Sequence, residues 1–353
     1  MQLRTGTLAL AMSVAAFAAG AIAQAPRIGK PRPAPATPSQ LPPLRPAEID
    51  NSLAIGGEAV KARKVESRMT VDVQLNGRGP YRFVVDSGAD TSVVGMGVAR
   101  DLQLPIGATA VLNSMTARNV VDRVNVDSMT VGPTTTTGLT LPALHEANLG
   151  AQGLIGIDAL VQQRLLMDFE KRVIKVENAR KPMKFEPGTI IIVAKRRRGQ
   201  LILTHVRAGG VSLDAVIDTG SEITIGNTAL RNKLFPRGAE KLDTMEITGV
   251  TGTTIKVQTV IVDELQLGPI LLQNVPIAFA DVPPFSVFGL AGEPALLIGT
   301  DLLENFRRVS LDFHARKVRF QLKRCDTRGF VLRATTSHTA SLLSASDPQV
   351  CGN

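Results

Sequence analysis

Tryptophan is absent from this sequence of 353 residues, and a single tyrosine accompanies 12 phenylalanines. Aromatic side chains that could stack on nucleic-acid bases are therefore scarce, and we expect no nucleic acid among the partners. The formal net charge of +9 could suit an anionic partner. Because lysine and arginine are spread along the chain, a soluble basic protein is the simpler interpretation. The basic run Lys195-Arg196-Arg197-Arg198-Gly199 is most simply a solvated connecting turn, with an anion site or a processing site as alternatives.

Histidine and cysteine are scarce as well, and this excludes several catalytic arrangements. The four histidines are scattered without the spacing of metal ligands, and two cysteines do not make a zinc site. The sequence contains no Gly-x-Ser-x-Gly motif and no phosphate-binding loop. We therefore expect neither a metal nor another cofactor. Cys325 and Cys351 lie near the C-terminus, where they could form a disulfide in an oxidising compartment or remain two free thiols.

Beyond the first residues, no apolar run is long enough to span a membrane. Residues 1–23 combine Arg4 with a short, alanine-rich apolar run, which predicts a secretory signal peptide cleaved after Ala23. An uncleaved N-terminal anchor is the alternative. With the signal removed, we expect export across the inner membrane to the periplasm and no stable membrane span. Residues 24–48 hold eight of the 21 prolines and are predicted to form an extended tether.

Two Asp-Ser/Thr-Gly tripeptides occur in the chain, and each follows three apolar residues. Asp86-Ser87-Gly88 ends the run Phe83–Val85, and Asp218-Thr219-Gly220 ends the run Ala215–Ile217. An apolar strand that stops at such a tripeptide turns sharply at the glycine and presents the carboxyl group. A lone tripeptide of this kind is most often a solvated turn, but two that end strands favour one shared site.

The tripeptides belong to an internal duplication. Four landmarks recur in the same order, 132, 136, 143 and 144 residues apart: the tripeptide, a Gly-Pro after a strand, an apolar-apolar-Gly element and an Asp-Phe pair. The spacing grows slowly, as loop insertions would make it. We therefore predict two lobes, residues 49–185 and 190–325, followed by a C-terminal tail, residues 326–353.

Both lobes are predicted to consist mainly of short strands. Alternating apolar residues lead into Asn76-Gly77 in the first half, and a similar strand leads into Gly209-Gly210 in the second, which predicts a hairpin before each tripeptide. Glycine and proline punctuate the remaining strands. The predicted fold class is all-β, with one or two short helices in each lobe.

The two carboxyl groups suggest a chemistry that needs no metal. Carboxylates held in contact cannot both be ionised, so the pair keeps one proton over a range of pH and titrates as a unit. The ionised member can take a proton from water, and the protonated member can donate one to a carbonyl oxygen. Ser87 and Thr219 supply hydroxyls that can lock the two turns together. Ala89 and Ser221 differ after the glycines, and a hydroxyl at Ser221 could favour the ionised form of its carboxylate.

These residues make the sequence similar to the retropepsin-like (retroviral-type) aspartic proteases, with two copies fused into one chain. Asp86-Ser87-Gly88-Ala89-Asp90 is close to the retroviral Asp-Thr-Gly-Ala-Asp signature, and the segment from Asn76 to Val85 resembles bacterial members. Leu154-Ile155-Gly156 and Leu297-Ile298-Gly299 match the apolar-apolar-Gly element that buttresses the catalytic loop in this family. The resemblance covers residues 60–325.

The resemblance implies an aspartic endopeptidase that hydrolyses polypeptides, with Asp86 and Asp218 as the catalytic pair. Asp90 and Glu222 are expected to be structural charges. Gly88 and Gly220 would offer carbonyl groups to the substrate backbone. The residues implied to support the catalytic loops are Ser87, Gly88, Thr219, Gly220, Gly156 and Gly299.

Flaps that cover the substrate are also implied. Gly249-Val250-Thr251-Gly252 resembles a flap tip of the second lobe, so Gly249 and Gly252 are implied in substrate binding. Its counterpart would lie within Leu112–Asn119, which holds no glycine. This departure leaves open a non-catalytic peptide-binding module with the same fold as the alternative function. We expect a monomer whose two lobes pair within one chain, rather than lobes of two chains.

Overall fold

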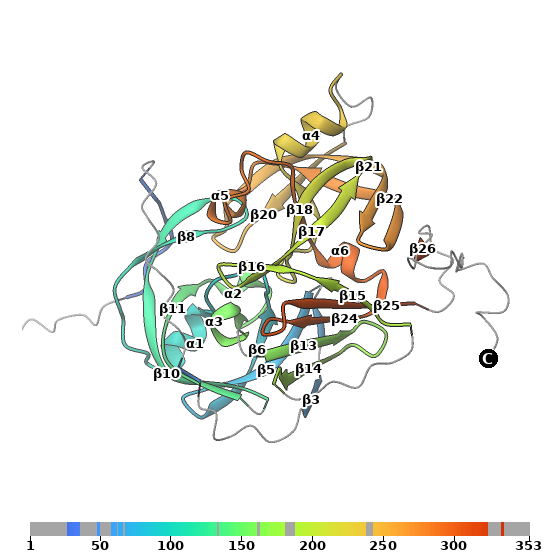
Figure 1. Ribbon diagram of the computed structural model, residues 1–353. Coiled ribbons are helices and arrows are strands. Elements are labelled where there is room, and N and C mark those ends of the chain that lie inside the picture. Colours follow the sequence, from blue (N-terminus) through green and yellow to red (C-terminus); the bar gives the residue numbers. More distant parts are fainter. Residues whose placement is uncertain are drawn as a thin grey trace, which may run out of the picture.

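The computed structural model describes residues 27–35, 48–49, 58–61, 63–65, 68–132, 134–160, 163–180, 188–237, 243–323 and 333–334 (Figure 1). The predicted signal peptide, both cysteines and most of the predicted tail lie outside these residues, so those predictions stay predictions.

The first lobe is built on a closed sheet. Its strands pair in the order β10-β11-β7-β12-β6-β5-β4, and a further pairing of β10 with β5 closes the barrel. The strands are β4 (Arg63–Val65), β5 (Arg68–Leu75), β6 (Arg78–Val85), β7 (Val93–Gly95), β10 (Arg123–Val131), β11 (Thr134–Leu144) and β12 (Gly153–Ile155). The short β2 (Glu48–Ile49) pairs with β11. The helices of this lobe are α1 (Met96–Asp101), α2 (Glu146–Leu149) and α3 (Ile157–Leu160).

The hairpin of β5 and β6 shows how the sequence specifies this barrel. Val71, Val73 and Leu75 are buried, while the residues between them are exposed, so one face of β5 packs into the core. Asn76 and Gly77 both have positive φ, at 50° and 70°, which is the geometry of a tight hairpin turn. The hairpin predicted at this Asn-Gly pair is confirmed.

The second lobe repeats the arrangement. Its strands pair in the order β16-β17-β18-β23-β19-β22-β21-β20, and β17 pairs with β21 to close the sheet. They are β16 (Lys195–Arg197), β17 (Gln200–Ala208), β18 (Val211–Ile217), β19 (Ile225–Gly226), β20 (Asp243–Thr248), β21 (Thr254–Leu267), β22 (Ile270–Phe279) and β23 (Ala295–Ile298). The short β26 (Arg333–Ala334) pairs with β22. The helices are α4 (Thr228–Leu234), α5 (Pro283–Val287) and α6 (Thr300–Leu303).

A six-stranded sheet joins the two lobes. Strands from both halves follow one another in the order β15-β25-β24-β13-β14-β3, and β13 pairs with β24 at the centre (Figure 1). The strands are β3 (Glu58–Lys61), β13 (Gln163–Asp168), β14 (Val173–Asn178), β15 (Ile190–Val193), β24 (Phe306–Asp312) and β25 (Lys317–Leu322). The lobes of this single chain therefore pair with each other through continuous backbone hydrogen bonds.

Reciprocal ion pairs reinforce this central junction. Arg164 of β13 lies 3.1 Å from Asp312 of β24, and Arg308 of β24 lies 2.6 Å from Asp168 of β13. Arg319 of β25 also reaches Asp312, at 3.3 Å. Asp168 and Asp312 are both buried, so these contacts satisfy charges that have lost most of their hydration. The duplicated landmarks of the sequence thus meet across the centre of the molecule.

A small three-stranded sheet lies beside the first barrel. It consists of β8 (Ala110–Asn113), β9 (Arg118–Val121) and the N-terminal β1 (Arg32–Pro33), in the order β1-β9-β8. Residues 27–35 belong to the segment predicted to be an extended tether. The chain is extended there, as the prolines require, and Arg32–Pro33 pairs with β9.

The predicted all-β class with two duplicated lobes is confirmed. Each lobe carries three short helices among its described residues, where one or two were expected. The additional ones are single turns of four residues, which leave little periodicity for sequence reading to detect. In the described part of the chain, no helix is long and apolar enough to cross a membrane.

Candidate active site

Both Asp-Ser/Thr-Gly tripeptides lie at the ends of buried barrel strands. Asp86 follows β6, and its N–H donates to the carbonyl of Ile155 at 2.9 Å. Asp218 follows β18, and its N–H donates to the carbonyl of Ile298 at 2.9 Å. In each lobe a parallel neighbour, β12 or β23, holds the strand end. The buried apolar residues before each aspartate explain why the loops start at equivalent points.

The hydroxyl groups after the two aspartates interlock. The Ser87 N–H donates to Thr219 Oγ1 at 2.9 Å, and the Thr219 N–H donates to Ser87 Oγ at 3.2 Å. Each hydroxyl then donates across the lobe boundary, from Ser87 to the carbonyl of Ile217 and from Thr219 to the carbonyl of Val85. The two loops are therefore tied together by four buried hydrogen bonds, in the arrangement that the resemblance implied.

This interlock brings the two aspartates into contact. The side chains of Asp86 and Asp218 are hydrogen-bonded to each other. The glycines leave the space for it, because a Cβ at Gly88 would lie 2.5 Å from Cγ of Asp218 and one at Gly220 would lie 2.1 Å from Cγ of Asp86. Each carboxyl group thus occupies the space beside the glycine of the opposite loop.

The loop backbone stabilises both carboxylates in the same way. One oxygen of Asp86 accepts the N–H groups of Gly88 and Ala89, at 2.8 and 2.9 Å. The corresponding oxygen of Asp218 accepts those of Gly220 and Ser221, at 3.0 and 3.2 Å. These hydrogen bonds favour the charged forms and oppose the effect of burial.

The two aspartates are nevertheless electrostatically unequal. Burial, and next the negative charge of Asp218, raise the pKa of Asp86 well above its usual range. Burial also raises the pKa of Asp218, but the hydrogen bond with Asp86 and the positive charge of Arg68 oppose that shift. The two carboxyl groups therefore titrate as a coupled pair that holds one proton between them over a range of pH.

Ser221 is not the cause of this difference. Its hydroxyl was expected to be able to donate to the carboxylate, but it donates to the carbonyl of Ile223 at 2.7 Å instead. Only its backbone N–H reaches Asp218. That expectation is wrong because the loop after Ser221 turns back and offers its hydroxyl a nearer acceptor.

The two buttressing glycines lie behind the catalytic loops. A Cβ at Gly156 would lie 2.5 Å from the backbone of Thr91, and one at Gly299 would lie 2.5 Å from the backbone of Ile223. Distances this short leave no room for a side chain, so only glycine lets the two backbones cross. The structure therefore places both glycines against the loops that they were predicted to support.

Two partly buried acids hold the same region, and sequence reasoning gave them no role. Asp158 accepts hydrogen bonds from the backbone and hydroxyl of Ser92, at 2.8 and 2.6 Å. Asp301 accepts the equivalent pair from Thr224, at 2.9 and 2.7 Å. Burial is the largest effect on both acids and raises their pKa values. The Gly-x-Asp pattern that follows both apolar elements is the sequence signal that could have identified them.

Asp90 and Glu222 make contacts between the lobes. Asp90 accepts a hydrogen bond from the amide of Gln200, and Glu222 lies 2.8 Å from Arg68. Gln200 and Arg68 occupy equivalent positions, as the first residues of β17 and β5. Both contacts fit the expected structural role, but one is an ion pair and the other is not.

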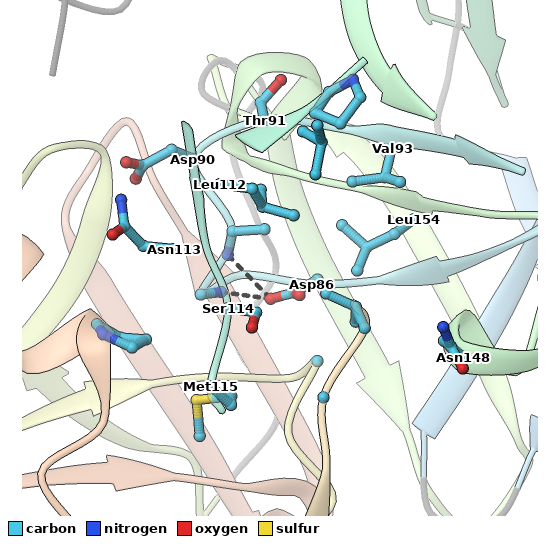
Figure 2. Close-up of a pocket in the computed structure, with 18 of the residues that line it drawn as sticks. Asp86, Asp90, Thr91, Val93, Leu112, Asn113, Ser114, Met115, Asn148 and Leu154 are labelled. Carbon is cyan, nitrogen blue, oxygen red and sulfur yellow. Dashed lines mark hydrogen bonds between the residues drawn. The ribbon is translucent and has the colours of Figure 1, made fainter. Parts of the chain in front are cut away.

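A cleft of about 1550 Å³ lies over the aspartate pair. It is lined by the loops that carry Asp86 and Asp218, by the β8–β9 hairpin and by the β20–β21 hairpin. Figure 2 shows the labelled lining residues of the first lobe around Asp86, with Asp90 and Asn113 on one side and Asn148 on the other. Residues from both lobes line the cleft, and its volume is large enough to accept an extended peptide segment.

Two hairpins form the flaps over this cleft. The first consists of β8 and β9, and its tip is closed by Ser114, whose N–H donates to the carbonyl of Ala117 and whose Oγ accepts the Ala117 N–H. The second consists of β20 and β21, with Gly249 and Gly252 at its tip. The missing glycine therefore does not abolish the first flap, because a serine side chain completes its turn.

The flap tips meet and cross to the opposite lobes. A Cβ at Gly249 would lie 2.1 Å from Oγ1 of Thr116, so the second flap passes directly against the first. Met115 of the first tip packs on the apolar cluster of the second lobe that contains Ile225 and Phe288. Val250 of the second tip packs on the cluster of the first lobe around Leu154. The two flaps thus cover the cleft reciprocally.

Comparison with known protein families agrees with this geometry. The family described as "gag-polyprotein putative aspartyl protease" matches residues 71–162, and the family described as "Aspartyl protease" matches residues 204–302. The chain belongs to the retropepsin-like aspartic proteases, and it carries two such domains in tandem that form two lobes. No curated protein matches the sequence.

Proposed function

We propose that the protein is an endopeptidase that hydrolyses peptide bonds with the Asp86–Asp218 pair. The observation that supports this most directly is the contact of two carboxyl groups, each with a pKa raised by burial, beneath two flaps. Membership of an aspartic protease family supports protease activity in general. The roles of the individual residues are part of the proposal.

The proposed reaction begins with a water molecule bound between the two carboxyl groups. Asp218 removes a proton from this water as its oxygen attacks the carbonyl carbon of the peptide bond, and Asp86 donates its proton to the carbonyl oxygen. The tetrahedral intermediate then collapses, and the C–N bond breaks as the nitrogen takes a proton from Asp218. Asp86 recovers the proton of the intermediate's hydroxyl, so the pair returns to its starting state.

The substrate is proposed to bind as an extended strand between the catalytic loops and the flaps. Exposed backbone groups of the flap hairpins would pair with the peptide, as in other cases of strand addition. The carbonyls of Gly88 and Gly220 would accept peptide N–H groups on either side of the scissile bond. Gly249 and Gly252 would let the second flap approach the peptide closely.

Substitution of either aspartate tests this function. Asp86→Asn and Asp218→Asn keep the size of the side chain but remove the proton exchange, and each should reduce cleavage of unfolded polypeptides by about 100-fold or more. Asp127→Asn is the matched control, because Asp127 is exposed and lies outside the cleft. The panel should be assayed between about pH 4 and pH 8, so that a shifted pH optimum does not hide activity. Turnover that survives in either active-site variant contradicts the proposal.

A transition-state mimic provides an independent test. A statine-type inhibitor places a hydroxyl group where the attacking water would lie, so it should compete with substrate and fail to bind Asp218→Asn. A protein that binds peptides tightly, protects them and never cuts them would instead be the non-catalytic binding module.

Location and assembly are proposed separately. We propose that residues 1–23 are removed on export and that the mature protein is a periplasmic monomer. N-terminal sequencing of the exported form and light scattering of the active species test the two statements. An intact Met1, or an active species with twice the mass of one chain, would contradict them.

A further inference from the structure

The two sides of the cleft carry equivalent positions with different charges. On one side Glu222 and Arg68 neutralise each other at 2.8 Å, and Arg68 is only 12% exposed. On the other side the amide of Gln200 takes the place of the arginine and donates to Asp90. The second side therefore lacks the internal cation that its counterpart has.

Arg198 brings a cation to that side from the surface. It stands in the two-residue turn between β16 and β17, where Arg197 pairs with Gln200. Arg198 and Gly199 both have positive φ, at 50° and 93°, so the turn is tight and holds the backbone of Arg198 in a defined conformation. Arg198 is exposed, and it lines the cleft together with Asp90.

The charge of Arg198 acts on the loop that carries Asp90. Burial raises the pKa of Asp90, while the hydrogen bond from Gln200 and the positive charge of Arg198 oppose that shift, so the guanidinium is near enough to affect the loop. Within the described part of the chain, Arg198 itself makes no ion pair and no hydrogen bond.

The other arginines of the cleft are engaged. Arg68 pairs with Glu222, and Nε of Arg123 donates to the carbonyl of Ala108 at 2.8 Å. Among the described residues, Arg198 is thus the lining arginine that makes no hydrogen bond or ion pair with the protein. A guanidinium offers several N–H groups in a planar fork, which matches a carboxylate group well.

We propose that Arg198 forms a subsite that binds a carboxylate group of the peptide substrate, in the part of the cleft near Asp90. This proposal rests on the proposed function, because it assigns part of the specificity of the same cleft. The carboxylate could come from an acidic side chain or from the C-terminus of a short peptide. A lysine or arginine at the same place would meet a like charge and be disfavoured.

Paired peptides test the subsite. A cleaved sequence with blocked ends is varied at each position in turn, with Glu, Gln or Lys, and kcat/KM is measured at low salt. At one position Glu should exceed Gln by roughly 2- to 5-fold, the range of an exposed ion pair, mainly through KM. The preference should weaken as ionic strength rises, because the pair is screened. Comparison of free and amidated C-termini separates the two sources of the carboxylate.

Variants then assign the preference to this side chain. Arg198→Gln should lose it, Arg198→Glu should reverse it in favour of Lys, and Arg198→Lys should retain part of it. Arg196→Gln is the matched control, because Arg196 is exposed on the same hairpin but does not line the cleft. It should keep the preference and the basal activity of the wild type.

The outcomes separate this proposal from the proposed function. Equal kcat/KM for Glu, Gln and Lys at every position, with equal cleavage of free and amidated ends, overturns the subsite but leaves the protease. Retention of the preference in Arg198→Gln, or its loss in Arg196→Gln, also overturns it. The affinities of the same peptides for the Asp86→Asn variant report the subsite without catalysis. If this variant prefers a carboxylate but the wild type cleaves no peptide, only the proposed protease function is contradicted.

Discussion

The first flap and the second flap are equivalent parts of the two lobes, but they are supported differently. Strand β1 pairs with the outer edge of β9, joining Arg32 to Val120 and Pro33 to Asn119. Asp122 strengthens this attachment, since it accepts the Gly29 N–H at 2.6 Å and lies 3.9 Å from Arg32. The second flap has no such brace among the described residues, because β20 pairs with β21 alone.

This difference shows which parts of a duplicated fold can diverge and which cannot. The catalytic loops must stay equivalent, because two carboxyl groups have to meet between them. The flaps are free to diverge, and here one is a braced three-stranded sheet with a serine-closed tip while the other is a two-stranded hairpin with a glycine tip. We therefore expect the second flap to make the larger movement when substrate binds.

The strongest test of loop equivalence replaces the two loop glycines. Gly88→Ala and Gly220→Ala each place a methyl group less than 3 Å from the opposite carboxyl group, so both should reduce kcat/KM by about 100-fold or more. Gly292→Ala is the control, because no atom lies within 4 Å of a Cβ at that position. A large loss in one variant alone would show that the two loops are not equivalent. Unchanged thermal unfolding should accompany the loss of activity.

The central ion pairs test whether the junction between the lobes is symmetric. Arg164→Ala leaves the buried Asp312 with only Arg319, and it should lower the free energy of unfolding by about 3 kcal/mol, at the low end for a broken buried pair. Arg308→Ala should cost less, because its pair with Asp168 is more exposed, at 13% and 7% against 5% and 1%. Urea unfolding measures both. Lys256→Ala, which breaks an exposed pair with Glu246, should change stability by less than about 1 kcal/mol.

Removal of the brace tests the comparison of the flaps directly. A chain that begins after residue 35 should show faster hydrogen exchange in β8 and β9, by a few-fold to about tenfold, because a short edge strand and one ion pair are lost. Exchange in β20 and β21 should not change. Asp122→Ala is a milder version that removes two of the contacts. Equal acceleration in both flaps would contradict the idea that the brace acts on the first alone.

The smallest expected effect concerns the charge difference within the aspartate pair. In the proposed mechanism Asp218 must be ionised, so we expect activity to be lost as pH falls through the pKa of that residue. Arg68 holds this pKa down, and Arg68→Gln should therefore move the acidic limb of the kcat/KM profile to higher pH. The equivalent change in the other lobe, Gln200→Ala, should leave the limb in place because Gln200 contacts Asp90 instead. An acidic limb that moves equally in both variants would contradict the assignment.

Sequence reading worked where the information is local. The apolar triplets, the two tripeptides and Asn76-Gly77 each specify a strand end or a turn within a few residues, so the catalytic loops and their hairpins could be predicted. The prediction from sequence was incomplete where segments that are distant in the chain contact each other. The partners of Asp158 lie more than 60 residues away, and the docking of residues 27–35 depends on an edge of β9 that no local pattern reveals.

The same distinction explains the errors in detail. The first flap tip lies within Leu112–Asn119, where it was expected, but its shape could not be read because a side-chain hydrogen bond of Ser114 replaces the backbone freedom that glycine would give. Ser221 was assigned a possible contact from its position after Gly220, but the direction of its hydroxyl depends on where the Ile223 carbonyl lies. Both outcomes are decided by geometry within the folded loop.

A peptide has a direction, from its amino end to its carboxyl end, and a cleft made of two identical halves cannot distinguish one orientation from the other. Here the Arg68–Glu222 pair lies on one side and Gln200–Asp90 lies on the other. Fusion of the two halves into one polypeptide has allowed them to become different in sequence. As a consequence, a bound chain meets unlike surroundings at its two ends, and the molecule has the means to select which way round it lies.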